Sequence, residues 1–335
     1  MARLRLSGRG PGGGPPCSAR RCPATSESYP QDTSQRGTTK PTQASGSQTE
    51  PGAFDRARFA SRLTTRRLGR TLLARAETSS TNDEAWDAIV VDAPDGTVVV
   101  ADAQTRGRGR AGRAWHSAPG KALALSVLLH QGCDRRSLGL LPLAAGLAVA
   151  QALETLGGAP ALKWPNDVRL QGRKVAGVLC ESRRVPASPG RPTAPPGRAA
   201  APAPADARDA AVVGVGVNVS QAAADFPPEL AETATSLALA GVATDRESVA
   251  AAFLNALEAL WTELQTGSRA ALLEAWSARA DFWGRAVAVR TPAGEVRGVA
   301  RALDPDGALV LVLEGGAETT VRAGDLDPAP GEVRA

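Results

Sequence analysis

The chain has 335 residues, a length that allows two domains of ordinary size with substantial cores. It carries 39 Lys and Arg against 34 Asp and Glu, a net charge of +5. Residues 1–52 hold +4 and residues 183–210 hold +3 of this charge, which leaves −2 for the remainder. The basic character therefore lies in two low-complexity segments, and it argues against a folded body built to bind nucleic acid.

The four cysteines, Cys17, Cys22, Cys133 and Cys180, do not form the framework of a disulfide-rich secreted domain. The N-terminus has arginines but no apolar segment typical of a secretory signal. The longest apolar stretch, about residues 138–156, is interrupted by polar residues and falls short of a bilayer span. We therefore expect a cytoplasmic protein that has no contact with membranes. With only two histidines in the chain, we expect no protein metal site.

Residues 1–52 are rich in Gly, Pro and Ser and cannot bury enough apolar surface to fold, so we expect a disordered tail. A short helical pattern follows over residues 54–73. Buried strands are predicted at residues 97–101 and 122–129, and a helix is predicted from Ser137 to Leu156, where Gly157-Gly158 marks its end.

Two more strands are predicted at residues 174–181 and 211–219, on either side of a proline-rich insertion at about 183–210 that we expect to be disordered. Helical patterns follow at residues 249–264 and 270–280, with Trp261 and Trp276 on their apolar faces. These elements predict an α+β body, a mixed β-sheet with helices, over residues 53–280.

From residue 281 to 335 the sequence changes to short alternating strands separated by the turns PAGE, PDG and EGG. We expect strands in the segments AVAVRT, EVRGVARALD, ALVLVL and ETTVRAGDL. This pattern predicts a small C-terminal β-barrel of about fifty residues.

The densest motif runs from Gln104 to Trp115 (QTRGRGRAGRAW) and lies between two predicted strands. Its glycines let the backbone approach a ligand closely, and Arg108, Arg110 and Arg113 supply forked donors suited to carboxylate and phosphate oxygens. A flexible Arg-Gly segment that binds nucleic acid is the competing interpretation. The single, short run between two strands favours a loop that binds an anion.

A second motif combines Lys163–Asp167 (KWPND) with Arg173–Gly177 (RKVAG). The chain has 35 arginines and only four lysines, so a lysine retained at 174 indicates a need for a compact point charge. Asn166 and Asp167 after Trp-Pro could equally form a simple turn. Gly177 within the following strand indicates that another group approaches closely.

Two weaker motifs complete the set. Glu77–Asn82 (ETSSTN) could simply cap a helix, which is the more common role of such a group. Gly214–Asn218 (GVGVN) is typical of a strand whose glycines make room beside a ligand. It is not a dinucleotide fingerprint, because its third glycine is missing.

In this order and at these separations, the four motifs resemble the bacterial biotin protein ligases over about residues 55–330. The resemblance implies a catalytic domain of the class II synthetase type followed by an SH3-like barrel. Larger members carry an N-terminal winged helix that binds DNA. Between the low-complexity head and the SSTN motif the sequence has no room for one, so we expect a ligase without repressor function. Arg106, Cys180 and the insertion depart from the family pattern.

The resemblance also implies roles for individual residues. Those implied to bind biotin are Ser80, Thr81, Asn82, Gln104, Gly107, Arg108, Lys174 and Gly177. Those implied to bind the nucleotide are Arg110, Arg113, Trp115, Asn166 and Asn218. Lys174, Arg110 and Arg108 would be catalytic, and Asp167 would orient one of the arginines.

The implied reaction uses ATP with Mg²⁺ carried by its phosphates. It forms biotinyl-AMP and then transfers biotin to a lysine of a biotin carboxyl carrier domain of a carboxylase, and we expect a monomer or a homodimer with no DNA partner. Attack of a carboxylate on a phosphate joins two anions, so such a site must neutralise charge and needs no side-chain nucleophile. Two alternatives stay open: a lipoate or octanoate ligase of the same fold, and a basic nucleic-acid-binding protein.

Overall fold

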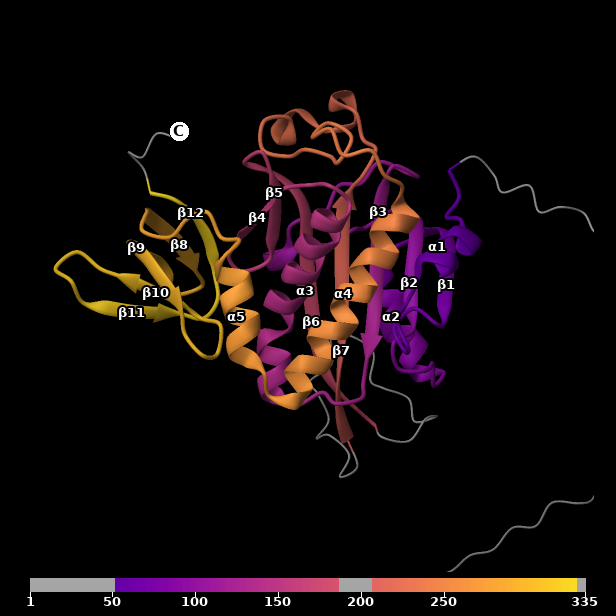
Figure 1. Cartoon of the computed structure of the whole chain (residues 1–335), viewed down its shortest axis with the longest axis horizontal. Helices are drawn as coiled ribbons and strands as arrows, with labels where there is room; N and C mark the ends of the chain where they lie inside the picture. The colour runs from indigo at the N-terminus through magenta and orange to yellow at the C-terminus, as the bar shows by residue number, and fades with distance from the viewer. Residues whose placement is uncertain (1–51, 187–206, 330–335) are drawn as a thin grey trace, which may run out of the picture. The chain divides into compact units, whose positions relative to one another are not determined.

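The computed structural model describes residues 52–186 and 207–329 (Figure 1). The predicted tail and the middle of the insertion lie outside this part of the chain. The larger of two sheets has seven strands in the order β1-β2-β3-β7-β6-β5-β4. Only β1 and β2 pair in parallel, so the sheet is mixed, as predicted. The strands are β1 Leu72–Thr78, β2 Val98–Gln104, β3 Ala122–Leu129, β4 Pro160–Lys163, β5 Asp167–Leu170, β6 Arg173–Pro186 and β7 Ala207–Asn218.

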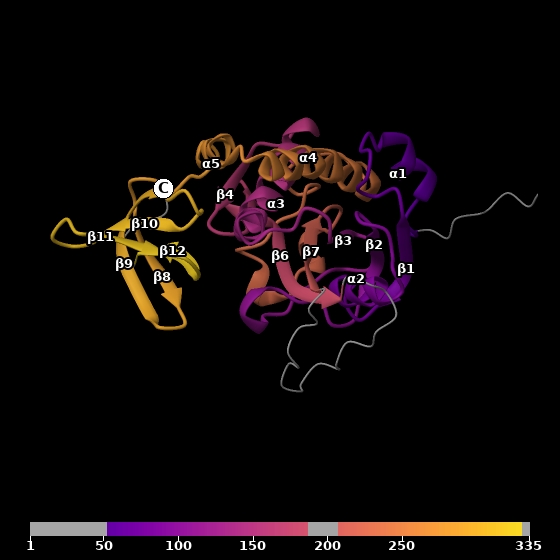
Figure 2. The ribbon, with the colours of Figure 1, turned by 90° about the horizontal axis from the view of Figure 1, so that it is seen from below.

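Helices cover both faces of this sheet (Figure 2). The helices are α1 Arg56–Arg62, α2 Thr81–Val90, α3 Arg135–Thr155, α4 Arg246–Thr266 and α5 Arg269–Ser277. The side chains of α3 and α4 join the main core, whereas α2 packs in a separate small cluster on the other face, around Trp86. Trp261 and Trp276 are buried in the main core, which confirms the predicted apolar faces of α4 and α5.

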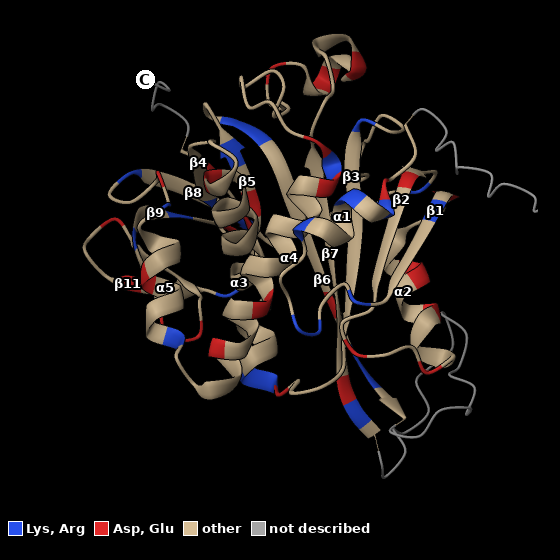
Figure 3. Cartoon of the chain, turned by 45° about the vertical axis from the view of Figure 1, so that its right-hand side comes forward, with Lys and Arg blue, Asp and Glu red and all other residues tan. Residues whose placement is uncertain are grey.

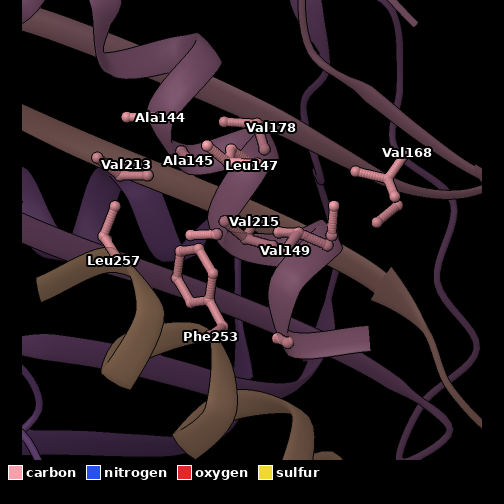
Figure 4. Close-up of a cluster of buried hydrophobic side chains, with 14 of the residues drawn as sticks. Ala144, Ala145, Leu147, Val149, Val168, Val178, Val213, Val215, Phe253 and Leu257 are labelled. Atoms are coloured by element: carbon pink, nitrogen blue, oxygen red, sulfur yellow. The ribbon is translucent and has the colours of Figure 1, made fainter. Parts of the chain in front are cut away.

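The centre of the sheet is built from strands that are buried on both faces. Every residue of β3 is buried, which explains why its run of apolar residues predicted the strand with its bounds. In β7 valines alternate with glycines. Val213 and Val215 point into the main core, so Gly214 and Gly216 must face the side of α2. Figure 4 shows part of the main core, in which α3 meets strands and α4: Ala144, Ala145, Leu147, Val149, Val168, Val178, Val213, Val215, Phe253 and Leu257.

Helix α3 is long and apolar enough to cross a membrane by length and composition alone. Its charged residues lie only at its two ends, Arg135 and Arg136 at the start and Glu154 near the finish (Figure 3). Between them most of the helix is buried against the sheet and α4. This is the pattern of the core helix of a folded domain.

Several elements differ from the sequence predictions. The helical pattern expected over residues 54–73 contains only the short α1, because residues 72–78 form β1 at the edge of the sheet. The KWPND motif is the turn between β4 and β5, neither of which was predicted as a strand. Strands β6 and β7 also run further into the expected insertion, because pairing continues to Pro186↔Ala207.

The C-terminal segment folds into an antiparallel sheet of five strands in the order β11-β10-β9-β8-β12. The segment ETTVRAGDL was wrongly predicted as one strand: it turns at Gly324, so that β11 pairs with β10 and β12 with β8. In the described residues no pairing between β11 and β12 closes this sheet. The strands are β8 Ala286–Thr291, β9 Gly294–Leu303, β10 Leu309–Val312, β11 Glu318–Val321 and β12 Asp325–Pro328.

The turn before β10 joins the two sheets. Gly307 has φ +80°, and its carbonyl accepts a hydrogen bond of 3.2 Å from Nε1 of the buried Trp164. A Cβ on Gly307 would lie 2.6 Å from a methyl carbon of Leu143 and 2.7 Å from one of Leu140, both on α3. Position 307 therefore requires glycine for two reasons. A side chain would collide with α3, and the positive φ is unfavourable for other residues.

We expect Gly307→Ala to destabilise the protein by more than the strain of a left-handed alanine, which costs roughly 1–2 kcal/mol. Overpacking against the two leucines should add about 1–3 kcal/mol to the loss in free energy of unfolding, measured in urea. Gly315→Ala is the matched control, because Gly315 also has a positive φ, +93°, and a Cβ at that position would meet no other group within 4 Å. Equal losses for the two variants would contradict the proposed contact.

Candidate active site

A cavity of about 400 Å³ lies on the α2 side of the seven-stranded sheet. It is bounded by the start of α2, the glycines of β6 and β7, the Arg-Gly loop of residues 105–115, and the segment 226–234. All of the predicted site residues except Gly107 line it. Gly107 lies at the base of the loop, where its carbonyl accepts a 2.9 Å hydrogen bond from the backbone N–H of Trp115.

One end of the cavity is polar but uncharged. The Oε1 atom of Gln104 accepts a hydrogen bond from the backbone N–H of Thr81 at 2.9 Å, and the Thr81 hydroxyl lies 3.2 Å from the same atom. Ser80 occupies the N-cap position of α2 but makes no capping hydrogen bond with its side chain. The capping role that the sequence favoured for this group is therefore not what Ser80 does, and its hydroxyl is available to a ligand.

Asn82 was predicted to bind biotin, but its amide is already engaged within the protein. Its Oδ1 is hydrogen-bonded to the Ser126 hydroxyl at 2.7 Å, and its Nδ2 donates to Glu181 Oε2 at 3.1 Å. A Cβ on Gly214 would collide with this side chain, so Gly214 makes room for Asn82. In this structure Asn82 supports the site from behind.

Paired glycines form the floor of the cavity. Gly177 on β6 and Gly216 on β7 are cross-strand partners, and the indole of Trp115 lies over both. Lys174 Nζ lies 5.6 Å from the centroid of the Trp115 ring, and a Cβ on Gly177 would lie 3.2 Å from Lys174 Nζ. The buried Nε1 of Trp115 has no hydrogen-bond partner among the described residues. The glycines thus give space to an aromatic ring and a charged side chain.

Lys174 is also fixed through its backbone. Its N–H donates to Thr233 O at 2.8 Å, and the N–H of Thr235 donates to Lys174 O at 2.9 Å. Asn218 holds the same segment, because its Nδ2 donates to Thr235 O and its Oδ1 accepts from Gln221. In this structure the Asn218 amide therefore stabilises the segment beside Lys174. That Asn218 also binds the nucleotide stays a prediction.

The arginines of the loop reach carboxylates on three different elements. Arg108 forms an ion pair of 2.8 Å with Asp83 on α2 and a longer one of 3.4 Å with Glu181 on β6. Arg113 pairs with Asp325 on β12 at 2.7 Å. These contacts tie the Arg-Gly loop to three elements around the cavity.

Arg110 differs from its neighbours because its hydrogen bonds are to neutral oxygens. It donates to Asn166 Oδ1 at 3.1 Å and to Gly324 O at 3.3 Å. Burial lowers the pKa of the Arg110 guanidinium, while the more distant Asp325 and Asp167 oppose that shift. A half-buried guanidinium without a carboxylate in hydrogen-bond contact strongly favours an arriving anion.

Asp167 was predicted to orient one of the arginines. Its Oδ1 lies 2.6 Å from Lys174 Nζ. The two residues are brought together because β5 pairs with β6, with Asp167 opposite Gly177. Asp167 therefore holds the lysine, and its charge also acts on Arg110, where it opposes the lowering of the pKa by burial. That it orients an arginine stays a prediction.

Sequence reasoning missed several residues around the cavity. Ser126 is the only polar residue in the strand ALALSVLL, and a lone hydroxyl in a fully buried strand was the available signal. Glu181 follows an apolar strand segment in the same way. Asp325 and Asp327 gave no local signal, because they reach Arg113 and Lys163 from the other sheet.

No group of three or more His, Cys, Asp or Glu side chains that could hold a metal ion is found in residues 52–186 and 207–329. Asp167 and Asp325 line or approach the cavity, but Lys174 and Arg113 occupy them.

Comparison with known proteins gives consistent matches. Residues 74–189 match the model of the Biotin/lipoate A/B protein ligase family, and residues 282–327 match the Biotin protein ligase C terminal domain. The chain is 36% identical over 259 residues to a biotin--[acetyl-CoA-carboxylase] ligase of Mycobacterium tuberculosis, covering 75% of this chain and 86% of that protein. It is 32% identical over 264 residues to the bifunctional ligase/repressor BirA of Bacillus subtilis, covering 78% and 75%.

A solved structure is similar over the same region. The biotin protein ligase from Aquifex aeolicus, in complex with biotin and ATP, matches with a TM-score of 0.61 and 28% identity, covering 77% of this chain and 98% of that chain. The predicted fold class is confirmed by this likeness and by the two family matches. The chain belongs to the biotin protein ligase family.

Proposed function

We propose that this protein joins biotin to ATP as biotinyl-AMP with release of pyrophosphate, and then transfers biotin to a lysine of a carrier domain. The observation that carries the proposal is the division of one cavity into two chemical halves. A neutral polar end with Ser80, Thr81 and Gln104 suits a ureido ring, and a cationic end with Arg110 and Lys174 suits a carboxylate and a phosphate.

The charge arrangement supports the first half-reaction. A biotin carboxylate oxygen attacks the α-phosphorus of ATP, a new P–O bond forms, and the bond to pyrophosphate breaks. Both reactants are anions, so catalysis requires fixed positive charge around the developing negative oxygens. We assign Arg108 and Lys174 to the carboxylate, Arg110 and Lys174 to the α-phosphate, and Arg113 to the departing pyrophosphate.

In the second half-reaction the amine of the acceptor lysine attacks the acyl carbon of biotinyl-AMP, and AMP leaves. The names of the relatives point to a biotin-dependent carboxylase as the source of the carrier domain. We propose that this reaction takes place in the cytoplasm. DNA binding, which the name of the Bacillus subtilis relative implies, is not part of the proposal.

Mg²⁺ would enter with ATP and be held by its phosphate oxygens, which are the hard ligands that this ion prefers. When bound it would supply charge neutralisation on the phosphates. The side chains of this protein would then position the triphosphate through Arg110 and Arg113.

The ordered Arg-Gly loop weighs against the nucleic-acid alternative. Its arginines are turned to Asp83, Glu181 and Asp325 around one cavity rather than presented along an open surface. A protein that read nucleic acid through this run would need several guanidinium groups free to contact successive phosphates.

We expect Arg110→Ala and Lys174→Ala each to lower the rate of biotin-dependent ATP–pyrophosphate exchange by about 100- to 1000-fold. Loss of one preorganised donor to developing charge costs about 2.7–4 kcal/mol of transition-state stabilisation. Arg297→Ala removes an exposed arginine from the C-terminal sheet and serves as the control, with exchange unchanged. Near-normal exchange in either cavity variant, with the fold verified by circular dichroism, would remove that residue from the mechanism.

The neutral end of the cavity should separate biotin from lipoate and octanoate, which have no ureido group. We expect the wild-type enzyme to support pyrophosphate exchange with biotin and not with the other two acids. Gln104→Leu should raise the KM for biotin by about tenfold or more, because a ureido partner is left unpaired at roughly 1–3 kcal/mol. Comparable exchange with lipoate in the wild type would show that the protein belongs to the other branch of its family.

A further inference from the structure

The amide of Asn82 bridges three strands behind the cavity. Its side chain extends from the first turn of α2 across Gly214 on β7, the glycine that leaves space for it. On β3 the residue opposite Gly214 is Ser126, and on β6 it is Leu179. The Asn82 amide therefore lies along one row of the sheet, β3-β7-β6, and we call this arrangement the Asn82 bridge.

Both ends of the Asn82 bridge are hydrogen-bonded to the sheet. On β3, the fully buried hydroxyl of Ser126 is hydrogen-bonded at 2.7 Å to Asn82 Oδ1 and at 2.7 Å to the Thr81 hydroxyl. On β6, Asn82 Nδ2 donates to Glu181 Oε2 at 3.1 Å. Two consecutive residues of the first turn of α2 are thus fixed to the sheet by side chains that do not line the cavity.

Glu181 connects this bridge to the Arg-Gly loop. Its Oε2 accepts from Asn82 Nδ2 and from Trp86 Nε1 at 3.0 Å, and its Oε1 accepts from Arg108 Nη2 at 3.4 Å. The Glu181 carboxylate therefore accepts hydrogen bonds from two side chains of α2 and from one side chain of the loop. The position of α2 and the position of the Arg108 guanidinium are coupled through it.

We propose that Ser126 and Glu181 are positioning residues for biotin. They hold the neutral end of the cavity, at Thr81, and the carboxylate-binding arginine, Arg108, at a fixed separation. This inference rests on the proposed function, because it assigns Thr81 and Arg108 to opposite ends of biotin.

A preorganised pair of contacts saves the entropy of ordering them when the substrate binds. Without the Asn82 bridge, the Arg108–Asp83 ion pair still joins the loop to the first turn of α2, but Ser126 and Glu181 no longer hold that turn against the sheet. Biotin must then supply more of this ordering, so biotin binding weakens. None of the hydrogen bonds in the bridge involves Lys174 or the segment 226–234. ATP binding should therefore change little.

The test compares Glu181→Gln and Ser126→Ala with the wild type in ATP–pyrophosphate exchange, and measures biotin binding without ATP by calorimetry. Glutamine keeps the shape of Glu181 but replaces one accepting oxygen with a donor. We expect the KM and the Kd for biotin to rise about tenfold or more in Glu181→Gln and about fivefold in Ser126→Ala. The KM for ATP should stay within about twofold in both.

Thr97→Val is the matched control. Thr97 is fully buried directly before β2 of the same sheet, and its hydroxyl donates to Pro94 O at 2.6 Å, outside the cavity. Its substitution should lower the Tm as Ser126→Ala does while leaving the KM for biotin unchanged. Ser126→Ala removes only one oxygen, so it tests the proposal even if Glu181→Gln fails to fold.

Because Ser126 and Glu181 both act through Asn82, the double variant should raise the KM for biotin by less than the product of the two single effects. A KM for biotin that stays at the wild-type value in both single variants would overturn the inference, and so would parallel rises for biotin and ATP. A wild-type enzyme without biotin-dependent exchange would instead overturn the proposed function. The two failures are therefore distinguishable.

Discussion

The cavity brings positively charged side chains close together, and the fold must compensate their mutual repulsion. Arg108, Arg110, Arg113 and Lys174 surround one space, and two unit charges about 4 Å apart repel by about 4 kcal/mol at an effective dielectric constant near 20. Carboxylates on α2, β5, β6 and β12 compensate three of the four charges. The fold therefore has to bring acidic residues from distant parts of the chain to one cavity. Both sheets supply such residues.

The remaining charge is the one that the substrates can neutralise. Arg110 is half-buried, and among the described residues its guanidinium donates to an amide oxygen and a backbone carbonyl but to no carboxylate, so it gains most when an anion arrives. In the proposed reaction the other cations would exchange one negative partner for another when substrates bind. Such an exchange costs less than separating a pair in isolation, which suits groups that must change partners during a reaction.

The sequence predicted the parts of this site whose signal is local. The buried run of β3 and the glycine-arginine loop could be located because composition and alternation act over a few residues. Partners could not be predicted, because they depend on strand register. Nothing near Asp167 shows that it lies opposite Gly177 and so beside Lys174, and the edge strand β1, with mixed exposure, lacks the clear alternation of a half-buried strand. For the same reason the two partners of Asn82 could not be predicted, because they lie on strands far along the chain.

The ion pair between Arg113 and Asp325 spans 212 residues of sequence. During synthesis on the ribosome, the loop and the whole seven-stranded sheet emerge long before the carboxylate that completes them. Until β12 has been made and has paired with β8, Arg113 lacks this partner. The loop over the cavity is therefore complete only after the last strand of the chain has taken its place.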